Sequence, residues 1–312
     1  MHRKTLLTSA LAGVAATAAV TLTVGAGTAN GAGGDWQPIG KGMTGGASGI
    51  SVTKADKDGD AFTALVVRDS KKAGESRLAE VAYEKGEQPR VQELTWQGEQ
   101  PVDLEAIDDV PGRTGGAAEY VAVTSDGTGY HFRLAGGTAK VLGTFALPAK
   151  VKDDNYENFA LAPAGDGLVA AWGNRGDDAT PTTLRAASVD FAGKGARFGD
   201  VETAEVEAPY PSKNIRHASD LKITNSGDLL VSSASDPGDD GPFDSGVYAA
   251  GHLSADSGKL TLKAEKKPEL LKKFEGHKIE ALDCLPNTHR AVLATDDENG
   301  GGAVRTASGV CG

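Results

Sequence analysis

Carboxylates recur in this sequence at one kind of place, close to the start of a short apolar stretch. Glu105, Glu157, Asp220 and Glu280 hold this place, and Asn158 directly follows the second of them. Carboxylate and amide oxygens are the ligands that hard cations such as Ca²⁺ prefer, and a cation-bound water can carry out hydrolysis. The five residues are therefore candidate metal ligands, with Ca²⁺ as the expected cofactor.

A second set of charged side chains follows the next apolar stretch of each unit, in polar loops. The most distinctive loop, 235–245, contains four Asp, two Pro and two Gly, and the acidic string 296–299 resembles it. Basic side chains lie at matching places and before Asp220, where they could offset the acids. The candidate ligand-binding residues are Arg68, Arg175, Arg216, His217, Asp239, Asp240, Asp244, Asp296, Asp297 and Glu298.

A repeat must bring these residues together. Units starting at Gly49, Asp103, Tyr156, Ser219 and Ile279 are 53 to 63 residues apart. Each has room for four short strands of small and β-branched residues between Gly-rich turns, which is typical of propeller blades. We expect an all-β chain forming a β-propeller of five four-stranded blades. The long units leave six blades open, and a β-sandwich or a β-solenoid is the alternative fold.

Ring closure follows from the two ends of the repeat. The last unit has room for only three strands before Gly312, and the segment 36–39 precedes the first unit. An N-terminal strand that completes the last blade would remove an exposed sheet edge. In such blades the start of the inner strand and the loop after the second strand share a face, so the candidates should meet at the mouth of a central channel.

The N-terminus resembles an export signal. Arg3 and Lys4 precede the charge-free stretch 6–24, and small residues follow it. We expect a signal peptide at 1–29, a single propeller domain at 30–312 and a secreted protein, with an uncleaved membrane anchor as the alternative. Cys284 and Cys311 are the only cysteines. An exported chain permits a disulfide between them.

Charge limits the partners. The chain has 32 basic and 43 acidic residues, a net charge of −11. This balance disfavours nucleic acid and anionic membranes and suits a soluble monomer that binds a cation or a small ligand.

The inner-strand pattern of a carboxylate, a small residue and an aliphatic residue resembles exported bacterial propellers of the phytase-like and esterase-like phytase type. Its placement is also similar to lactonases of the gluconolactonase type, which hold one divalent cation. The resemblance implies Glu105, Asn158, Asp220 and Glu280 as cation ligands and a hydrolytic activity.

Three functions therefore stay open. The first is an exported acidic propeller that binds a cation or small ligand, the second a metal-dependent hydrolase of the phytase-like or lactonase type, and the third a structural or protein-interaction propeller. The sequence favours the first because no nucleophile and base stand at catalytic spacing. Whether the chain is an enzyme stays open.

Overall fold

The structure is a computed structural model that describes residues 36–112, 118–256 and 259–312. The predicted signal peptide at 1–29 lies outside these residues. The chain divides into two units, Met1–Ala32 and Gly33–Gly312, and the second contains all the described residues. No helix in the described part is long and apolar enough to span a membrane.

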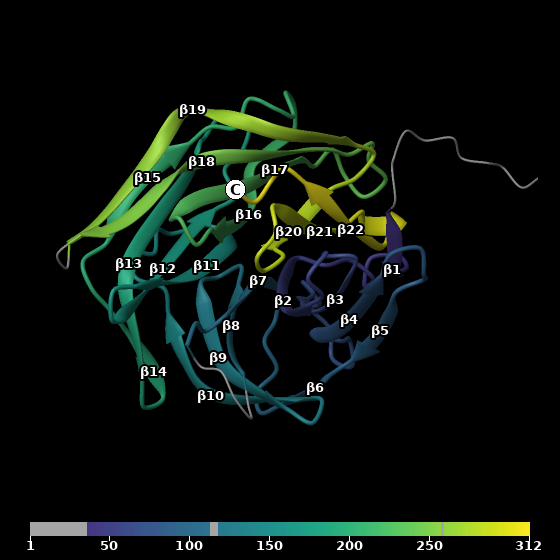
Figure 1. Ribbon diagram of the computed structural model, residues 1–312, viewed down its shortest axis with the longest axis horizontal. Helices are drawn as coiled ribbons and strands as arrows, with labels where there is room; N and C mark the ends of the chain where they lie inside the picture. Colours follow the sequence, from purple (N-terminus) through teal and green to yellow (C-terminus); the bar gives the residue numbers. More distant parts are fainter. Residues whose placement is uncertain (1–35, 113–117, 257–258) are drawn as a thin grey trace, which may run out of the picture. The chain divides into compact units, whose positions relative to one another are not determined.

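Five antiparallel blades surround one axis in the second unit, as Figure 1 shows. Blade 1 consists of β2 (Gly49–Ala55), β3 (Ala61–Val67), β4 (Leu78–Glu84) and β5 (Arg90–Glu93). Blade 2 consists of β7 (Leu104–Asp109), β8 (Glu119–Thr124), β9 (Thr128–Ala135) and β10 (Thr138–Ala146). The short β6 (Thr95–Gln97) pairs in parallel with β10 and covers the outer edge of blade 2. The five-bladed propeller predicted from the repeat is confirmed.

Blades 3 and 4 are the largest. Blade 3 consists of β11 (Tyr156–Ala164), β12 (Gly167–Asn174), β13 (Thr182–Ala192), β14 (Gly195–Phe198) and β15 (Glu202–Val206). Blade 4 consists of β16 (Ile215–Ile223), β17 (Asp228–Ser235), β18 (Asp244–Asp256) and β19 (Lys259–Glu275). Both β14 and β15 pair with β13. The Lys-rich segment at 266–273 belongs to strand β19 and pairs with β18, where Leu270 lies opposite Tyr248.

Blade 5 closes the ring. It consists of β20 (Ile279–Cys284), β21 (Arg290–Thr295), β22 (Gly302–Ser308) and β1 (Gln37–Gly40), with the short 3-10 helix η1 (Glu298–Gly300) between β21 and β22. Strand β1 pairs antiparallel with β22, so the N-terminal strand completes the last blade as predicted. Strand β1 covers the edge of β22 that would otherwise be exposed.

The hydrophobic core lies between neighbouring blades rather than at one centre. Ala160 of β11 packs with Ala218 of β16 in one cluster, and Ile50 of β2 packs with Ala281 of β20 in another. Small residues let the inner strands approach closely where the blades converge on the axis. Each inner strand contacts the inner strands of both neighbouring blades, which fixes their polar ends relative to one another.

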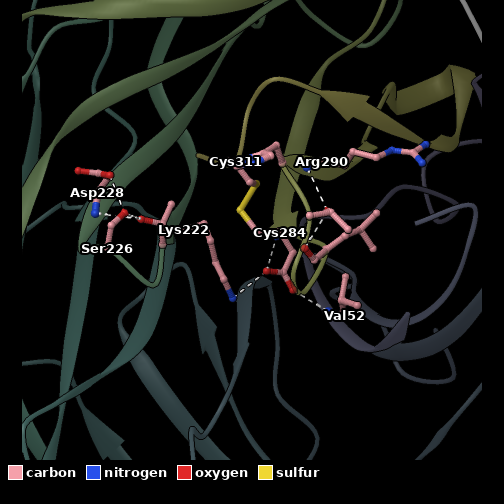
Figure 2. The surroundings of a disulfide bond; sticks show 12 residues. Val52, Lys222, Ser226, Asp228, Cys284, Arg290 and Cys311 are labelled. Carbon is pink, nitrogen blue, oxygen red and sulfur yellow. Dashed lines mark hydrogen bonds and ion pairs between the residues drawn. A yellow bond between two sulfur atoms is a disulfide. The ribbon is translucent and has the colours of Figure 1, made fainter. Parts of the chain in front are cut away.

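A disulfide joins Cys284 at the end of β20 to Cys311 after β22. The predicted bond is therefore present, and its two residues are 27 apart in sequence. Figure 2 shows it beside the end of the axis that carries Lys222. It fastens the C-terminal segment to the inner strand of blade 5.

Candidate ligand site at the propeller axis

Three glutamates occupy the same irregularity in three blades. In each, the first residue of the inner strand pairs with the second strand, the next residue is left out of the register, and pairing resumes one residue later. The omitted residues are Glu105, Glu157 and Glu280. A bulged residue is free of the regular ladder and its side chain can be re-aimed. The three glutamates thus point to a common level of the axis, and this level with its charged neighbours is called the axial site below.

Arg216 is the second residue of the inner strand of blade 4, as the three glutamates are in theirs, but it pairs with Ala234 and the bulge comes after it. Asp220 therefore does not lie at the level of the glutamates, where the sequence predicted it. Ile215 opens β16 by pairing with Ser235, and Arg216 follows it. Residues 217–219 then form a wider bulge before Asp220 pairs with Ser232. The extra residues move Asp220 further along the axis, to the level that Asp108 of β7 holds.

At that second level the Asp220 side chain accepts hydrogen bonds from backbone N–H groups. Its two carboxylate oxygens accept the N–H groups of Leu221 (2.8 Å) and of Leu282 in blade 5 (2.6 Å). Asp108 accepts the Leu161 N–H of the next blade at 2.8 Å in the same way. Buried carboxylates that cap backbone donors stabilise the contact between blades.

An ion-pair network occupies much of the axial site. One terminal nitrogen of Arg216, Nη1, lies 3.2 Å from Glu157 Oε2 and 2.6 Å from Glu280 Oε1, and Nη2 pairs with Asp236. Burial disfavours the charge of Arg216, but Glu157 and Glu280 outweigh burial and raise its pKa. The arginine therefore stays charged and holds two of the three glutamates.

Two more cations support the same carboxylates. Lys278 Nζ lies 3.1 Å from Glu280 Oε1 and pairs with Glu298, while Arg175 Nη1 lies 3.4 Å from Glu157 Oε1. Lys278 is fully buried. Sequence reasoning missed this lysine, because its burial follows from contacts between blades.

Glu105 differs from the other two glutamates. It is partly exposed, and within the described ranges its side chain has no hydrogen bond or ion pair. Burial by surrounding protein, followed by the charges of Glu157 and Glu280, raises its pKa well above the ordinary value. For Glu157 burial also raises the pKa, but Arg216 opposes the rise. Neighbouring carboxyl groups whose pKa values are pushed apart can serve as acid and base.

The rim beside Glu105 is acidic as well. Burial raises the pKa of Asp69, and burial with the charge of Glu280 raises the pKa of Asp296 to about 8. Asp296 is almost completely buried, so its neutral form dominates around neutral pH. A cavity of about 370 Å³ adjoins the axial site and is lined by Arg175, Arg216 and Asp236 among others.

The other predicted metal ligands face different surroundings. The amide nitrogen of buried Asn158 donates to the Ala218 carbonyl of the next blade at 3.3 Å. Of the five candidates, the structure gathers Glu105, Glu157 and Glu280 at one level. Among the described residues, no group of three or more His, Cys, Asp or Glu side chains is arranged to hold a metal ion. Binding of Ca²⁺ stays a prediction.

The remaining ligand candidates divide between the rim and the interior. The 235–245 and 296–299 loops meet as expected, since Asn299 donates to Asp240 at 3.0 Å and to the backbone of Asp239 at 3.2 Å. Asp244 opens β18, and Asp297 lies 2.7 Å from His277 Nδ1. Two others have interior roles: buried His217 contacts the Ala208 carbonyl at 3.1 Å, and buried Arg68 donates to the Thr44 carbonyl.

Comparisons with known proteins identify the fold alone. No family model and no curated protein matches the sequence. An α-L-arabinofuranosidase from Podospora anserina in complex with cellotriose matches with a TM-score of 0.51 and 8% identity, over 88% of this chain and 98% of that one. A protein described as a glycoside hydrolase matches with a TM-score of 0.50 and 9% identity, over 87% of this chain and 61% of that one.

The propeller fold is thus shared with glycoside hydrolases. Neither of these two structures is described as a phytase or a lactonase, so the resemblance of the inner strands to those families stays a prediction.

Proposed function

We propose that the axial site binds a small, hydroxyl-rich organic molecule and that Glu105 is its principal contact. The observation that carries this proposal is the contrast between Glu105, which has no partner in the described structure, and its two ion-paired neighbours. A neutral carboxyl group both donates and accepts hydrogen bonds, as does a hydroxyl group. The cavity of about 370 Å³ on the other side of the ion-pair network, lined by Arg175 and Arg216 and not by Glu105, is of a size that small ligands use.

An uncharged organic ligand suits the site better than a bare cation does. Arg216, Lys278 and Arg175 already satisfy Glu157 and Glu280, so a cation would have to displace them. A hydroxyl-rich molecule could instead use the remaining donors of Arg175, whose side chain is 39% exposed. The predicted signal peptide and the disulfide support a site of action outside the cell.

Hydrolysis of a glycosidic bond is the second candidate function. It is favoured by the separation of carboxyl states in the axial site and by the propeller fold shared with glycoside hydrolases. Such hydrolysis needs a protonated carboxyl group to give its proton to the leaving oxygen, and a carboxylate to attack the sugar or activate water. Glu105 would be the acid, and Glu157 or Glu280 the carboxylate.

Titration calorimetry with arabinose and with cellotriose tests the binding proposal. We expect Glu105→Ala to weaken binding at least about tenfold, because alanine removes both the donor and the acceptor of the carboxyl group, and Glu105→Gln, which keeps a donor and an acceptor, to weaken it less. The matched controls are Glu205→Ala and Glu205→Gln on strand β15, where Glu205 is exposed. Equal affinity of Glu105→Ala and Glu205→Ala for a sugar that binds would remove Glu105 as the contact. No heat with either sugar would argue against a site for hydroxyl-rich molecules and favour a protein-interaction role.

Release of nitrophenol from 4-nitrophenyl α-L-arabinofuranoside tests the second candidate in the same samples. Turnover that Glu105→Gln abolishes and Glu205→Gln keeps would support hydrolysis. Binding without turnover would leave a binding protein.

A further inference from the structure

Arg216 is the one basic residue among the second residues of the five inner strands, three of which are glutamates and one of which is Ile50. In blades 2, 3 and 5 the second residue of the inner strand is Glu, and in blade 4 it is Arg. Four carboxylates at this level would repel one another, and replacing one by a cation turns repulsion into attraction. Arg216 therefore puts a positive charge between Glu157 and Glu280, and it does not contact Glu105.

From this geometry we infer that Arg216, held by Asp236, is a positioning residue that fixes the side chains of Glu157 and Glu280 through ion pairs and leaves Glu105 as the group free to engage a ligand. That Glu105 contacts a ligand rests on the proposed function, whereas the positioning of Glu157 and Glu280 by Arg216 concerns the protein alone. The residue acts through its neighbours, since its own terminal nitrogens are occupied by three carboxylates.

The anchor of Arg216 comes from the loop after β17. Asp236 pairs with Arg216 Nη2, and its backbone N–H donates to the Asn214 carbonyl at 2.8 Å. Burial favours the neutral form of Asp236, yet Arg216 and Lys278 lower its pKa overall. A charged Asp236 on one side and two glutamates on the other restrict the planar guanidinium to one orientation, which is the property that Arg has and Lys lacks.

The charged groups around Glu157 come from four blades. Arg175 and Arg216 face its carboxylate directly, and Glu280 and Lys278 act on it from blade 5. Glu105 acts from blade 2, where Asp103 and Asp69 in turn face it. Arg216 is closer to Glu157 than Arg175 is, at 3.2 Å against 3.4 Å. Of these two arginines, Arg216 is the one that also contacts Glu280.

Carboxyl-carbon NMR of protein labelled with ¹³C-glutamate tests the inference without any ligand. In the unmodified protein we expect Glu105 to titrate at clearly higher pH than Glu157. In Arg216→Gln we expect the midpoint of Glu157 to rise by about one pH unit or more and to approach that of Glu105. Arg216→Lys should restore part of the separation, and Arg175→Gln should change it less.

Asp236→Asn supplies a second variant if Arg216→Gln does not fold. This variant keeps Arg216 but removes the carboxylate that holds it, so the titration midpoints of Glu105 and Glu157 should approach each other by a smaller amount than in Arg216→Gln. Unchanged Glu157 titration in a folded Arg216→Gln or Asp236→Asn protein would overturn the inference. The proposed function fails separately, if the unmodified protein shows the expected titrations but binds neither arabinose nor cellotriose.

Discussion

The behaviour of each carboxyl group at the axis depends on whether a cation stands beside it. Glu157 and Glu280 have Arg216 within ion-pair distance, whereas Asp296 is buried with Glu280 and Glu298 as neighbours and is opposed mainly by Lys278. A buried carboxyl group with mostly acidic neighbours is stable when neutral. Its titration therefore affects the stability of the whole fold.

Asp296→Asn should make the protein more stable at alkaline pH. Burial and Glu280 raise the pKa of Asp296 to about 8 in the folded protein. The folded state then holds more protons than the unfolded state between the two pKa values, so stability falls as pH rises from about 4 to about 8. Asparagine does not titrate, and the free energy of unfolding of the variant at pH 8 should exceed that of the unmodified protein by at least about 1 kcal/mol.

Urea unfolding at pH 5 and pH 8 measures this difference. Asp126→Asn is the opposite control: although burial acts against ionisation there, its hydrogen bonds with Thr124 and Thr128 lower its pKa overall. Its carboxylate stabilises the fold above the unfolded pKa of about 4 and loses that effect only at lower pH, so this variant should be less stable than the unmodified protein by the same amount at pH 5 and at pH 8. Identical pH dependence of Asp296→Asn and the unmodified protein would show that Asp296 is not buried as a neutral acid.

At the scale of the strands, periodicity was enough to predict the blades but not the local register. The unbroken apolar runs Val121 to Val123 and Val292 to Ala294 mark second strands buried on both faces, and both strands lie as expected. The position of Asp220 failed because the sequence shows a carboxylate before an apolar pair and not the bulge at 217–219 that precedes it. A bulge depends on pairing with another strand, which no local pattern encodes.

The same limit explains the residues that were missed. Arg216 was a candidate because it is basic and near Asp220, but its place among the glutamates appears only after the register of β16 is known. Lys278 and Asp236 became visible through contacts between blades. The disulfide was predictable since only two cysteines exist, and compartment rather than geometry supported it.

The disulfide joins the C-terminal segment to strand β20, and its contribution to the free energy of unfolding can be estimated. Replacing both cysteines by Ala should lower the free energy of unfolding by about 3.5 kcal/mol, the loop-entropy value for residues 27 apart. Denaturation of the variant and of the oxidised protein in urea measures it. A double replacement that costs less than about 1 kcal/mol would mean that blade 5 holds the C-terminal segment without help.

At the scale of the whole ring, buried carboxylates join blades that are distant in sequence. Asp283 of blade 5 accepts the Val52 N–H of blade 1 at 2.6 Å, and Lys222 of blade 4 reaches the same carboxylate. Val52 and Lys222 are labelled in Figure 2. Lys222 Nζ lies 2.8 Å from Asp283 and 2.8 Å from Asp108 of blade 2. One side chain thus connects three blades at the level below the axial site.

Removal of that cation should therefore destabilise the ring as a whole. Lys222→Met keeps the length of the side chain but leaves Asp108 and Asp283 buried without their charge partner, and breaking a buried pair costs about 3–5 kcal/mol. Lys85→Met is the control, because that lysine is 62% exposed and pairs with Asp60 at the surface, where a pair contributes about 1 kcal/mol or less.

The double variant Lys222→Met, Asp108→Asn distinguishes electrostatics from packing. Burial raises the pKa of Asp108 to about 7 even with Lys222 opposing it, so without the lysine an ionised Asp108 is costly and the neutral amide should recover part of the loss. The cost of Lys222→Met should also shrink as pH falls towards about 7, because without the lysine Asp108 takes up its proton at a higher pH than in the unmodified protein. If urea unfolding at pH 8 gives Lys222→Met the stability of Lys85→Met, the closure of the ring depends on the apolar contacts between blades, and the bridge across the axis contributes little.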